Sequence, residues 1–347
     1  MPEIMSFDSC IKECKEAGIR PKVLLGNGFS IDYDKLIFEY GSLFDEAKLE
    51  RLSEDKKDVF DAVDSRDFEV VVDRLRTASR IVKLYGGDDD FVKVLKDDAD
   101  VVRDGLAEVL IDNHPRSVSV LKSSEIVQAR TFLAEFEEIF TLNYDLLLYW
   151  VLNRVDGLCN GVPRTDGFGS RGDRLVWDPE NEQVVHYLHG AFHLYVEDGK
   201  LYKRRYDHAP IINQVQDALT EDTYPLVVTE GSSLEKKRRV KVDRTGYLSE
   251  THKRFSRLHG SLFVHGASLD NNDKHIFGAI SRKGSRIDRL YVGLFLNGVG
   301  VEDVKNRARG IAEEYKANNN RTELPVIFYD SQTAEVWRTH EPCSSSL

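Results

Sequence analysis

VLLGNGFS, residues 23–30, is the stretch of sequence that decides the fold of this chain. Its three aliphatic residues predict a short buried strand, and the two glycines let the backbone turn tightly into a helix, as in units that bind a diphosphate. The spacing is GxGxS rather than GxGxxG, and tight turns also use glycine for steric reasons alone. No second strand with a ribose-binding acid follows about 20 residues later, so an ordinary dehydrogenase is disfavoured.

Five further apolar runs end in polar or glycine-containing turns, and we predict that they are also buried strands. They lie at residues 139–141, 226–229, 262–264, 290–295 and 326–329. Helical stretches separate the runs, as an α/β topology requires, although the last run follows Pro325 and could equally be an edge strand. The sequence therefore predicts an α/β fold with a Rossmann-like, mostly parallel sheet.

A long segment separates the first two strands and must have structure of its own, because it exceeds a hundred residues and a crossover helix needs far fewer. We predict that residues 41–135 form a large helical insertion after the first strand. Residues 1–40 and 136–347 are then expected to form the core.

Helical periodicity is clearest at residues 68–85 of this insertion, where apolar residues recur at three-and-four spacing. Ser65 is the expected N-cap, and two glycines at 86–87 are the expected stop. Further helices are predicted near 46–64 and 91–110. The acidic run before the last of these suits a helix N-terminus better than a metal site.

Composition indicates a soluble globular protein, with 41% hydrophobic and 31% charged residues. The net charge of −11 argues against general binding of nucleic acid, and the basic run at 236–241 is interpreted as a solvated loop. Four cysteines are too scattered for a disulfide framework or a paired-cysteine zinc site. No apolar run reaches the roughly 20 residues of a membrane helix, so a cytoplasmic location is expected.

The second strand ends in TLNYD, residues 141–145. This places Asn143 and Asp145 beyond the carboxyl end of a strand, where α/β sheets bind ligands. The alternative is structural, because either side chain could cap the apolar helix that follows.

Three histidines occur in HYLHGAFH, residues 186–193. Neutral imidazoles are common metal ligands, but no cysteine or acidic ligand is spaced nearby in the sequence. A general base at His189, beside a glycine-opened pocket, explains the pattern at least as well. His186 and His193 are expected to be structural.

Small residues follow two later strands, in VVTEGSS (227–233) and FVHGASL (263–269). Backbone could approach a phosphate or a ribose at both places, although turn chemistry alone would also produce them.

In this order the five motifs resemble the motif series of the sirtuins. The chain resembles more closely the zinc-free, sirtuin-like, NAD-consuming proteins of bacterial antiphage defence, over about residues 20 to 295. The resemblance implies a sirtuin-like fold with NAD as substrate. It implies that Asn143 lies beside the nicotinamide ribose, that Asp145 supports Asn143, and that His189 is the general base. The implied NAD-binding residues are Gly26, Asn27, Gly28, Phe29, Ser30, Gly190, Gly231, Gly266 and Ser268.

One departure from the sirtuin pattern bears on the reaction. No cysteine lies between His189 and Cys343, so the paired-cysteine zinc module of sirtuin deacylases is missing and no metal is expected. We therefore expect an NAD hydrolase that yields nicotinamide and ADP-ribose. The alternatives are a non-catalytic module that senses NAD or ADP-ribose, and a zinc-free deacylase or ADP-ribosyltransferase.

The resemblance also implies a biological setting, namely antiphage defence by NAD depletion. The insertion would then serve assembly of a homo-oligomer or contact with a partner such as a hexameric ATPase or translocase.

Overall fold

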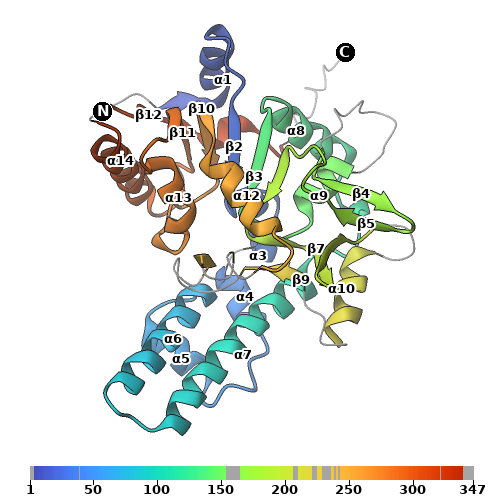
Figure 1. Ribbon diagram of the computed structural model, residues 1–347, viewed down its shortest axis with the longest axis vertical. Coiled ribbons are helices and arrows are strands. Elements are labelled where there is room, and N and C mark those ends of the chain that lie inside the picture. The colour runs from blue at the N-terminus through green and yellow to red at the C-terminus, as the bar shows by residue number, and fades with distance from the viewer. Residues whose placement is uncertain are drawn as a thin grey trace, which may run out of the picture.

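The computed structural model describes residues 4–38, 40–153, 165–205, 210–220, 225–228, 236–237, 240, 243–320 and 322–338. A seven-stranded sheet that is parallel throughout forms its centre (Figure 1), in the order β1-β12-β11-β10-β2-β3-β6. The strands are β1 (Met5–Ser6), β2 (Lys22–Leu25), β3 (Glu138–Thr141), β6 (Val185–Tyr187), β10 (His259–His265), β11 (Arg286–Leu294) and β12 (Val326–Asp330). This confirms the predicted Rossmann-like sheet.

The strand order reverses beside β2. From β2 the chain adds β3 and β6 on one side, and then returns to add β10, β11 and β12 on the other. Counted along the chain from β2, this is the 3-2-1-4-5-6 order of dinucleotide-binding sheets. Ligands bind such sheets in the crevice outside the carboxyl ends of the two strands at the reversal, which here are β2 and β10.

Helices cover both faces of the sheet because successive strand residues point to opposite sides. Val23 and Ile139 lie in one hydrophobic cluster, whereas their neighbours Leu24 and Phe140 lie in another. Burying each such side chain stabilises the fold by about 1.5–3 kcal/mol. The first face is covered by α1 (Phe7–Glu16) and α8 (Ser123–Ala134), and the second by α12 (Tyr247–Ser256), α13 (Lys274–Ser281) and α14 (Val301–Asn318).

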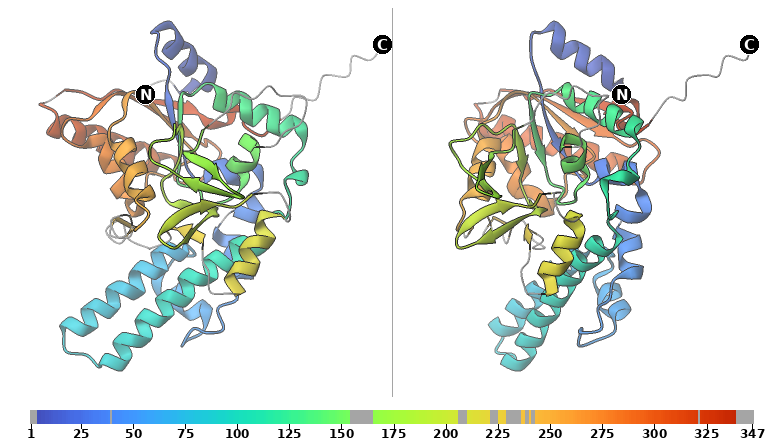
Figure 2. Two further views of the ribbon diagram at one scale, coloured as in Figure 1. Left: turned by 45° about the vertical axis from the view of Figure 1, so that its right-hand side comes forward. Right: turned by 90° about the vertical axis from the view of Figure 1, so that its right-hand side faces the viewer.

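The segment between β2 and β3 is helical, as predicted. After α2 (Gly28–Tyr33) and α3 (Lys35–Phe38), it contains α4 (Tyr40–Glu46), α5 (Lys56–Val63), α6 (Phe68–Leu84), α7 (Asp89–Asn113), η1 (Val118–Val120) and α8. Figures 1 and 2 show α6 and α7 side by side, extending away from the sheet. Of the helix expected near 46–64, only α5 (Lys56–Val63) and the last residue of α4 are helical, so that prediction was wrong in its N-terminal bound.

The N-cap of α6 also differs from the prediction. Asp67, not Ser65, accepts hydrogen bonds from the amides of Glu69 and Val70. Ser65 instead accepts from the amide of Asp67. Both residue types cap helices, and the sequence pattern alone could not choose between them.

Large apolar side chains are exposed where α6 ends and α7 begins. Leu84 and Tyr85 are 81% and 85% exposed, and Ile81 and Phe91 are also exposed. The end of α6 and the beginning of α7 lie at the end of the insertion that is far from the sheet (Figure 1). The assembly role expected for the insertion stays a prediction.

A second, antiparallel sheet was not predicted from the sequence. Its order is β4-β5-β8-β7-β9. Residues 226–227 of the run expected in the parallel sheet belong to its edge strand β9 instead, and residue 229 of that run lies outside the described residues. A run this short does not specify the direction of its partner, and Pro225 suits an edge because it lacks an amide hydrogen. The strands are β4 (Phe168–Arg171), β5 (Arg174–Trp177), β7 (Gly190–Glu197), β8 (Lys200–Lys203) and β9 (Pro225–Val227). Further helices with described bounds are α9 (Leu147–Asn153), α10 (Ile211–Thr220), η2 (Asn271–Asp273) and η3 (Ser331–Ala334).

β12 pairs with both β11 and β1, so it is not an edge strand. Among the described helices, none combines the length and the apolar composition that crossing a membrane requires.

Candidate functional site

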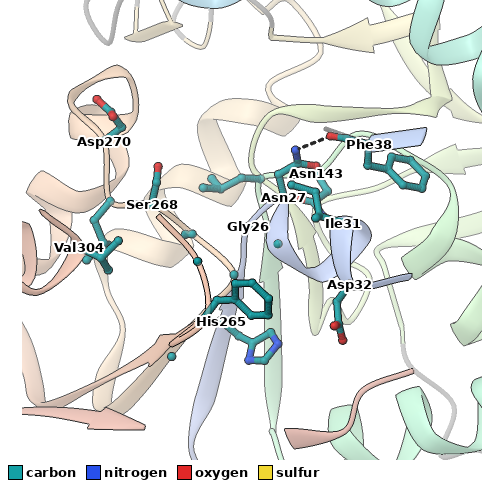
Figure 3. Close-up of a pocket in the computed structure, with 18 of the residues that line it drawn as sticks. Gly26, Asn27, Ile31, Asp32, Phe38, Asn143, His265, Ser268, Asp270 and Val304 are labelled. Carbon is teal, nitrogen blue, oxygen red and sulfur yellow. Dashed lines mark hydrogen bonds between the residues drawn. The ribbon is translucent and has the colours of Figure 1, made fainter. Parts of the chain in front are cut away.

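A cavity of about 950 Å³ opens at the carboxyl ends of β2 and β10, where the strand order reverses. Small-molecule sites usually measure about 300–1,000 Å³. Figure 3 shows Asn27 and Asn143 on one side of this cavity, and Ser268 and Asp270 on the other. Most of the predicted site residues line it, namely Gly26, Asn27, Gly28, Asn143, Asp145, His189, Gly266 and Ser268.

The glycines of the two turns are required because the turns pack directly on each other. The Gly28 amide donates to the Gly266 carbonyl at 2.7 Å, and the Gly26 amide donates to the His265 carbonyl at 2.9 Å. A Cβ atom at Gly28 would lie 2.6 Å from the Cα atom of Gly266, and one at Gly26 would lie 2.6 Å from that of Ala267. No real side chain fits at such distances, so glycine is a steric requirement at both positions.

This packing means that the amides of the first glycine turn do not bind a diphosphate in the way such turns often do. The amides after the turn are already used within the protein, since Gly28 donates to Gly266, Phe29 to Gly26 and Ser30 to Asn27. The Asn27 side chain donates to the carbonyl of Phe38 at 3.0 Å (Figure 3). The turn therefore lines the cavity, while these amides donate hydrogen bonds to carbonyls of the two turns.

Phe29 and Ser30 are predicted site residues that lie behind the cavity. Phe29 is buried against Trp337, with ring centroids 5.0 Å apart, and its carbonyl accepts a hydrogen bond from the Trp337 indole at 2.7 Å. It does not cover a ligand, because its ring belongs to the core. Ser30 is fully buried and does not line the cavity, but its hydroxyl contacts Asn143 and Asp145, which do.

Ser30 connects the two polar residues that follow β3. Its hydroxyl donates to Oδ2 of Asp145 at 2.5 Å and accepts from Nδ2 of Asn143 at 2.9 Å. Asp145 also accepts from the amide of Leu147 at 2.8 Å, so it caps α9, as the structural alternative predicted. Asp145 thus supports Asn143 through Ser30, and Asn143 remains directed into the cavity rather than capping the helix (Figure 3).

His189 lies between β6 and β7 and lines the same cavity. Its Nε2 atom is 3.3 Å from Nε2 of His275 and 3.5 Å from Oδ1 of Asp273. Burial lowers the pKa of His189 well below its ordinary value, although Asp273 opposes this shift. His189 is therefore neutral at cellular pH and has an anion beside it that would stabilise a proton taken up by the ring.

His186 and His193 do not join His189. His186 contacts Glu138 at 2.8 Å through Nε2 and stacks on Phe140. His193 is buried on β7 between the rings of Tyr149 and Tyr187. Both are structural, as expected.

Gly190 has a structural role rather than one in binding. Its φ is +74°, and a Cβ atom there would lie 1.9 Å from the carbonyl oxygen of Leu226 on the neighbouring strand β9. Glycine is needed because the chain passes from one sheet to the other at this point. Gly231, another predicted binding residue, lies outside the described residues.

A family model described as Domain of unknown function (DUF4917) matches residues 23–337. The chain belongs to this family. The DUF4917 match begins with VLLGNGFS and continues past β12, so it includes Asn143, His189 and both glycine turns. No curated protein matches the chain.

Lys236 is a cavity residue of this DUF4917 domain that sequence reasoning placed in a solvated loop. That interpretation was wrong, because Lys236 is 1% exposed and donates to Glu69 at 2.6 Å and Asp273 at 2.9 Å. Lysine is almost never fully buried without a partner. The neighbouring Lys237 is exposed, and the other basic residues of the run lie outside the described residues.

Sequence reasoning also missed Asp273 and His275, because they follow His189 by more than eighty residues. The only local sign of a site is that the two residues are two positions apart and follow the small residues at the end of β10. Asp273 supplies the acidic group that the sequence near His189 lacks, and His275 supplies a second imidazole.

Proposed function

We propose that this DUF4917 protein hydrolyses NAD at the bond between nicotinamide and ribose. The observation that supports this most is that Asn143 and His189, 46 positions apart in the sequence, line one cavity. The cavity opens at the reversal of a 3-2-1-4-5-6 sheet, which is where dinucleotides bind such sheets. The resemblance of the motif series to the sirtuins supports the same substrate.

The cavity offers suitable groups to both halves of a dinucleotide. Ser268 and Asp270 follow β10 and provide oxygen atoms for the hydroxyls of one ribose (Figure 3). Asn143 provides an amide for the other. Lys35 and Arg338 also line the cavity and bring positive charge for a diphosphate, in place of the turn amides.

The reaction needs few catalytic groups because nicotinamide is already a cationic leaving group in NAD. The bond between ribose C1′ and nicotinamide nitrogen breaks, and its electron pair leaves with the nicotinamide. A water oxygen bonds to C1′ in its place, and the water proton passes to Nε2 of His189, which acts as the general base. Asn143 orients the ribose and the water, and Asp273 stabilises the imidazolium that forms.

Nicotinamide release from NAD by the full chain tests this proposal. Asn143→Ala and His189→Ala should each lower the rate at least about 100-fold, since a positioned base contributes about 10²–10⁴-fold. His259→Ala is the matched control, because His259 is exposed at the start of β10, at the opposite edge of the sheet.

The alternatives give different results in the same assay. A sensing module would bind NAD or ADP-ribose without releasing nicotinamide, and His189→Ala would leave that binding intact. A deacylase or ADP-ribosyltransferase would release nicotinamide only when an acylated peptide or another acceptor is present. Failure to bind either NAD or ADP-ribose would refute the proposal and both alternatives.

A further inference from the structure

Three potential metal ligands from distant parts of the chain meet at one wall of the cavity. His189 follows β6, Asp273 ends η2, and His275 is the second residue of α13. One nitrogen or oxygen atom from each lies within 4.8 Å of the other two. His189 and Asp273 line the cavity, so an ion could reach these atoms from solvent.

The distances match the edges of a tetrahedral zinc site. Zinc binds histidine nitrogen at about 2.0–2.1 Å, and two such bonds at the tetrahedral angle place the nitrogens about 3.3–3.4 Å apart. The two Nε2 atoms of His189 and His275 are 3.3 Å apart, and Nε2 of His189 is 3.5 Å from Oδ1 of Asp273. An octahedral site with the same bond lengths would require about 2.9 Å between adjacent nitrogens, so the tetrahedral arrangement fits better.

The charges around the three ligands also favour a cation. Lys236 contacts both Glu69 and Asp273, so one ammonium group faces two carboxylates in a buried cluster. When both carboxylates are ionised, these three residues carry one net negative charge. Burial raises the pKa of Glu69 to about 7, so this charge is complete only above that pH. A carboxylate oxygen has two lone pairs, so Asp273 can accept from Lys236 and still coordinate an ion. A hydrogen-bonded carboxylate of this kind is usual in metal sites, where outer groups orient the ligands.

We infer that His189, Asp273 and His275 bind one divalent ion of the zinc class, with a fourth position open to the cavity. Three protein ligands and one open position are the arrangement of zinc sites that also bind water or a ligand. Two imidazoles and a carboxylate disfavour Mg²⁺ and Ca²⁺, which prefer oxygen ligands.

Titration of the metal-free full chain with Zn²⁺, followed by calorimetry, tests the site. We expect one equivalent to bind. Co²⁺ in place of Zn²⁺ should give the strong visible absorption of a four-coordinate ion. Even loss of an outer-shell partner lowers metal affinity by about 10–100-fold, so His189→Ala and His275→Ala should each lower it at least tenfold.

His252→Ala is the matched control. His252 stacks on His275 with ring centroids 5.6 Å apart, but its Nε2 is bonded to the Leu188 carbonyl. It belongs to the same histidine cluster without being a ligand, so the variant should keep the wild-type affinity. If His275→Ala fails to fold, His275→Gln replaces it. The proposal is overturned if wild type binds no stoichiometric Zn²⁺, or if the His252 and His275 variants lose affinity equally.

The ion also bears on the proposed hydrolysis, and this consequence rests on that function. Coordination occupies the Nε2 lone pair that His189 needs to accept a proton. Zn²⁺ should therefore inhibit nicotinamide release at least tenfold, and a chelator should restore it. Because binding is measured without NAD, a chain that binds Zn²⁺ but releases no nicotinamide would refute the hydrolase alone. A rate unchanged at saturating Zn²⁺ would refute the inhibition.

Discussion

Ser30 donates a hydrogen bond of 2.5 Å to Oδ2 of Asp145, although 115 positions separate the two residues. The bond joins α2, which follows the first glycine turn, to the loop that follows β3. The same hydroxyl accepts from Asn143 at 2.9 Å. The orientation of the Asn143 side chain in the cavity thus depends on a residue that does not itself line the cavity.

Ser30→Ala should therefore affect both stability and the site. It removes a hydrogen-bond donor from the Asp145 carboxylate, which is only 5% exposed, and leaving a buried carboxylate without its partner costs about 1–3 kcal/mol. We expect a loss of that size in the free energy of unfolding, measured by urea denaturation.

Ser79→Ala provides the comparison for this change. Ser79 is equally buried, but its hydroxyl donates to the Arg76 carbonyl of its own helix. Alanine suits a helix interior better than serine does, so this variant should lose less than about 1 kcal/mol. Equal losses of unfolding free energy in the two variants would show that the hydrogen bond between Ser30 and Asp145 stabilises the fold no more than the bond within the helix at Ser79.

Much of the cavity could be predicted because it depends on local patterns and on parallel geometry. Short aliphatic runs identified the strands, and parallel strands place their carboxyl ends at one edge. Residues that follow different strands, such as Asn143 and Gly266, were therefore expected to meet. Lys236 could not be predicted in this way. Its burial depends on Glu69 and Asp273, which are 167 and 37 positions away, and no periodicity in the sequence reports such a contact.

Gly28→Ala tests the packing of the two turns. The added Cβ would lie 2.6 Å from the Cα atom of Gly266, and backbone cannot move aside as a flexible side chain can. We expect a loss of at least about 2 kcal/mol in unfolding free energy, since overpacking commonly costs about 1–3 kcal/mol. Gly278→Ala is the control in α13, where a Cβ meets nothing within 4 Å. It should stabilise the protein by about 0.5–1 kcal/mol. Tolerance of alanine at both positions would contradict the steric argument.

The contact between Lys236 and Glu69 connects the helical insertion to the rest of the cavity wall. Lys236→Met should destabilise the protein by about 3–5 kcal/mol, because it leaves buried carboxylates without their cation. Adding Glu69→Gln should recover part of this loss, which a double-mutant cycle measures as a coupling of about 0.5–3 kcal/mol. Lys237→Met, at the exposed neighbour, should change stability by less than about 0.5 kcal/mol. Additive effects of the Lys236 and Glu69 changes would mean that the two residues do not interact.

His114 makes the loop after β3 sensitive to acid. It follows α7, its Nε2 accepts from the Leu146 amide at 3.0 Å, and its Nδ1 donates to the Pro115 carbonyl at 3.0 Å. Both bonds require the neutral ring with its proton on Nδ1, since a proton on Nε2 would face the Leu146 amide. Burial lowers the pKa of His114 from 6.5 to about 4.

Because the folded pKa of His114 lies below the unfolded one, the unfolded chain binds the proton more tightly. The contribution of His114 is fully present above pH 6.5 and is lost as the pH falls toward about 4. Between pH 7 and pH 5 this amounts to about 2 kcal/mol of unfolding free energy. His114→Gln cannot titrate in this range, so its stability should fall less over the same interval in urea denaturation. Parallel curves for wild type and variant would show that the imidazole stays neutral for another reason, or that it does not bear on folding.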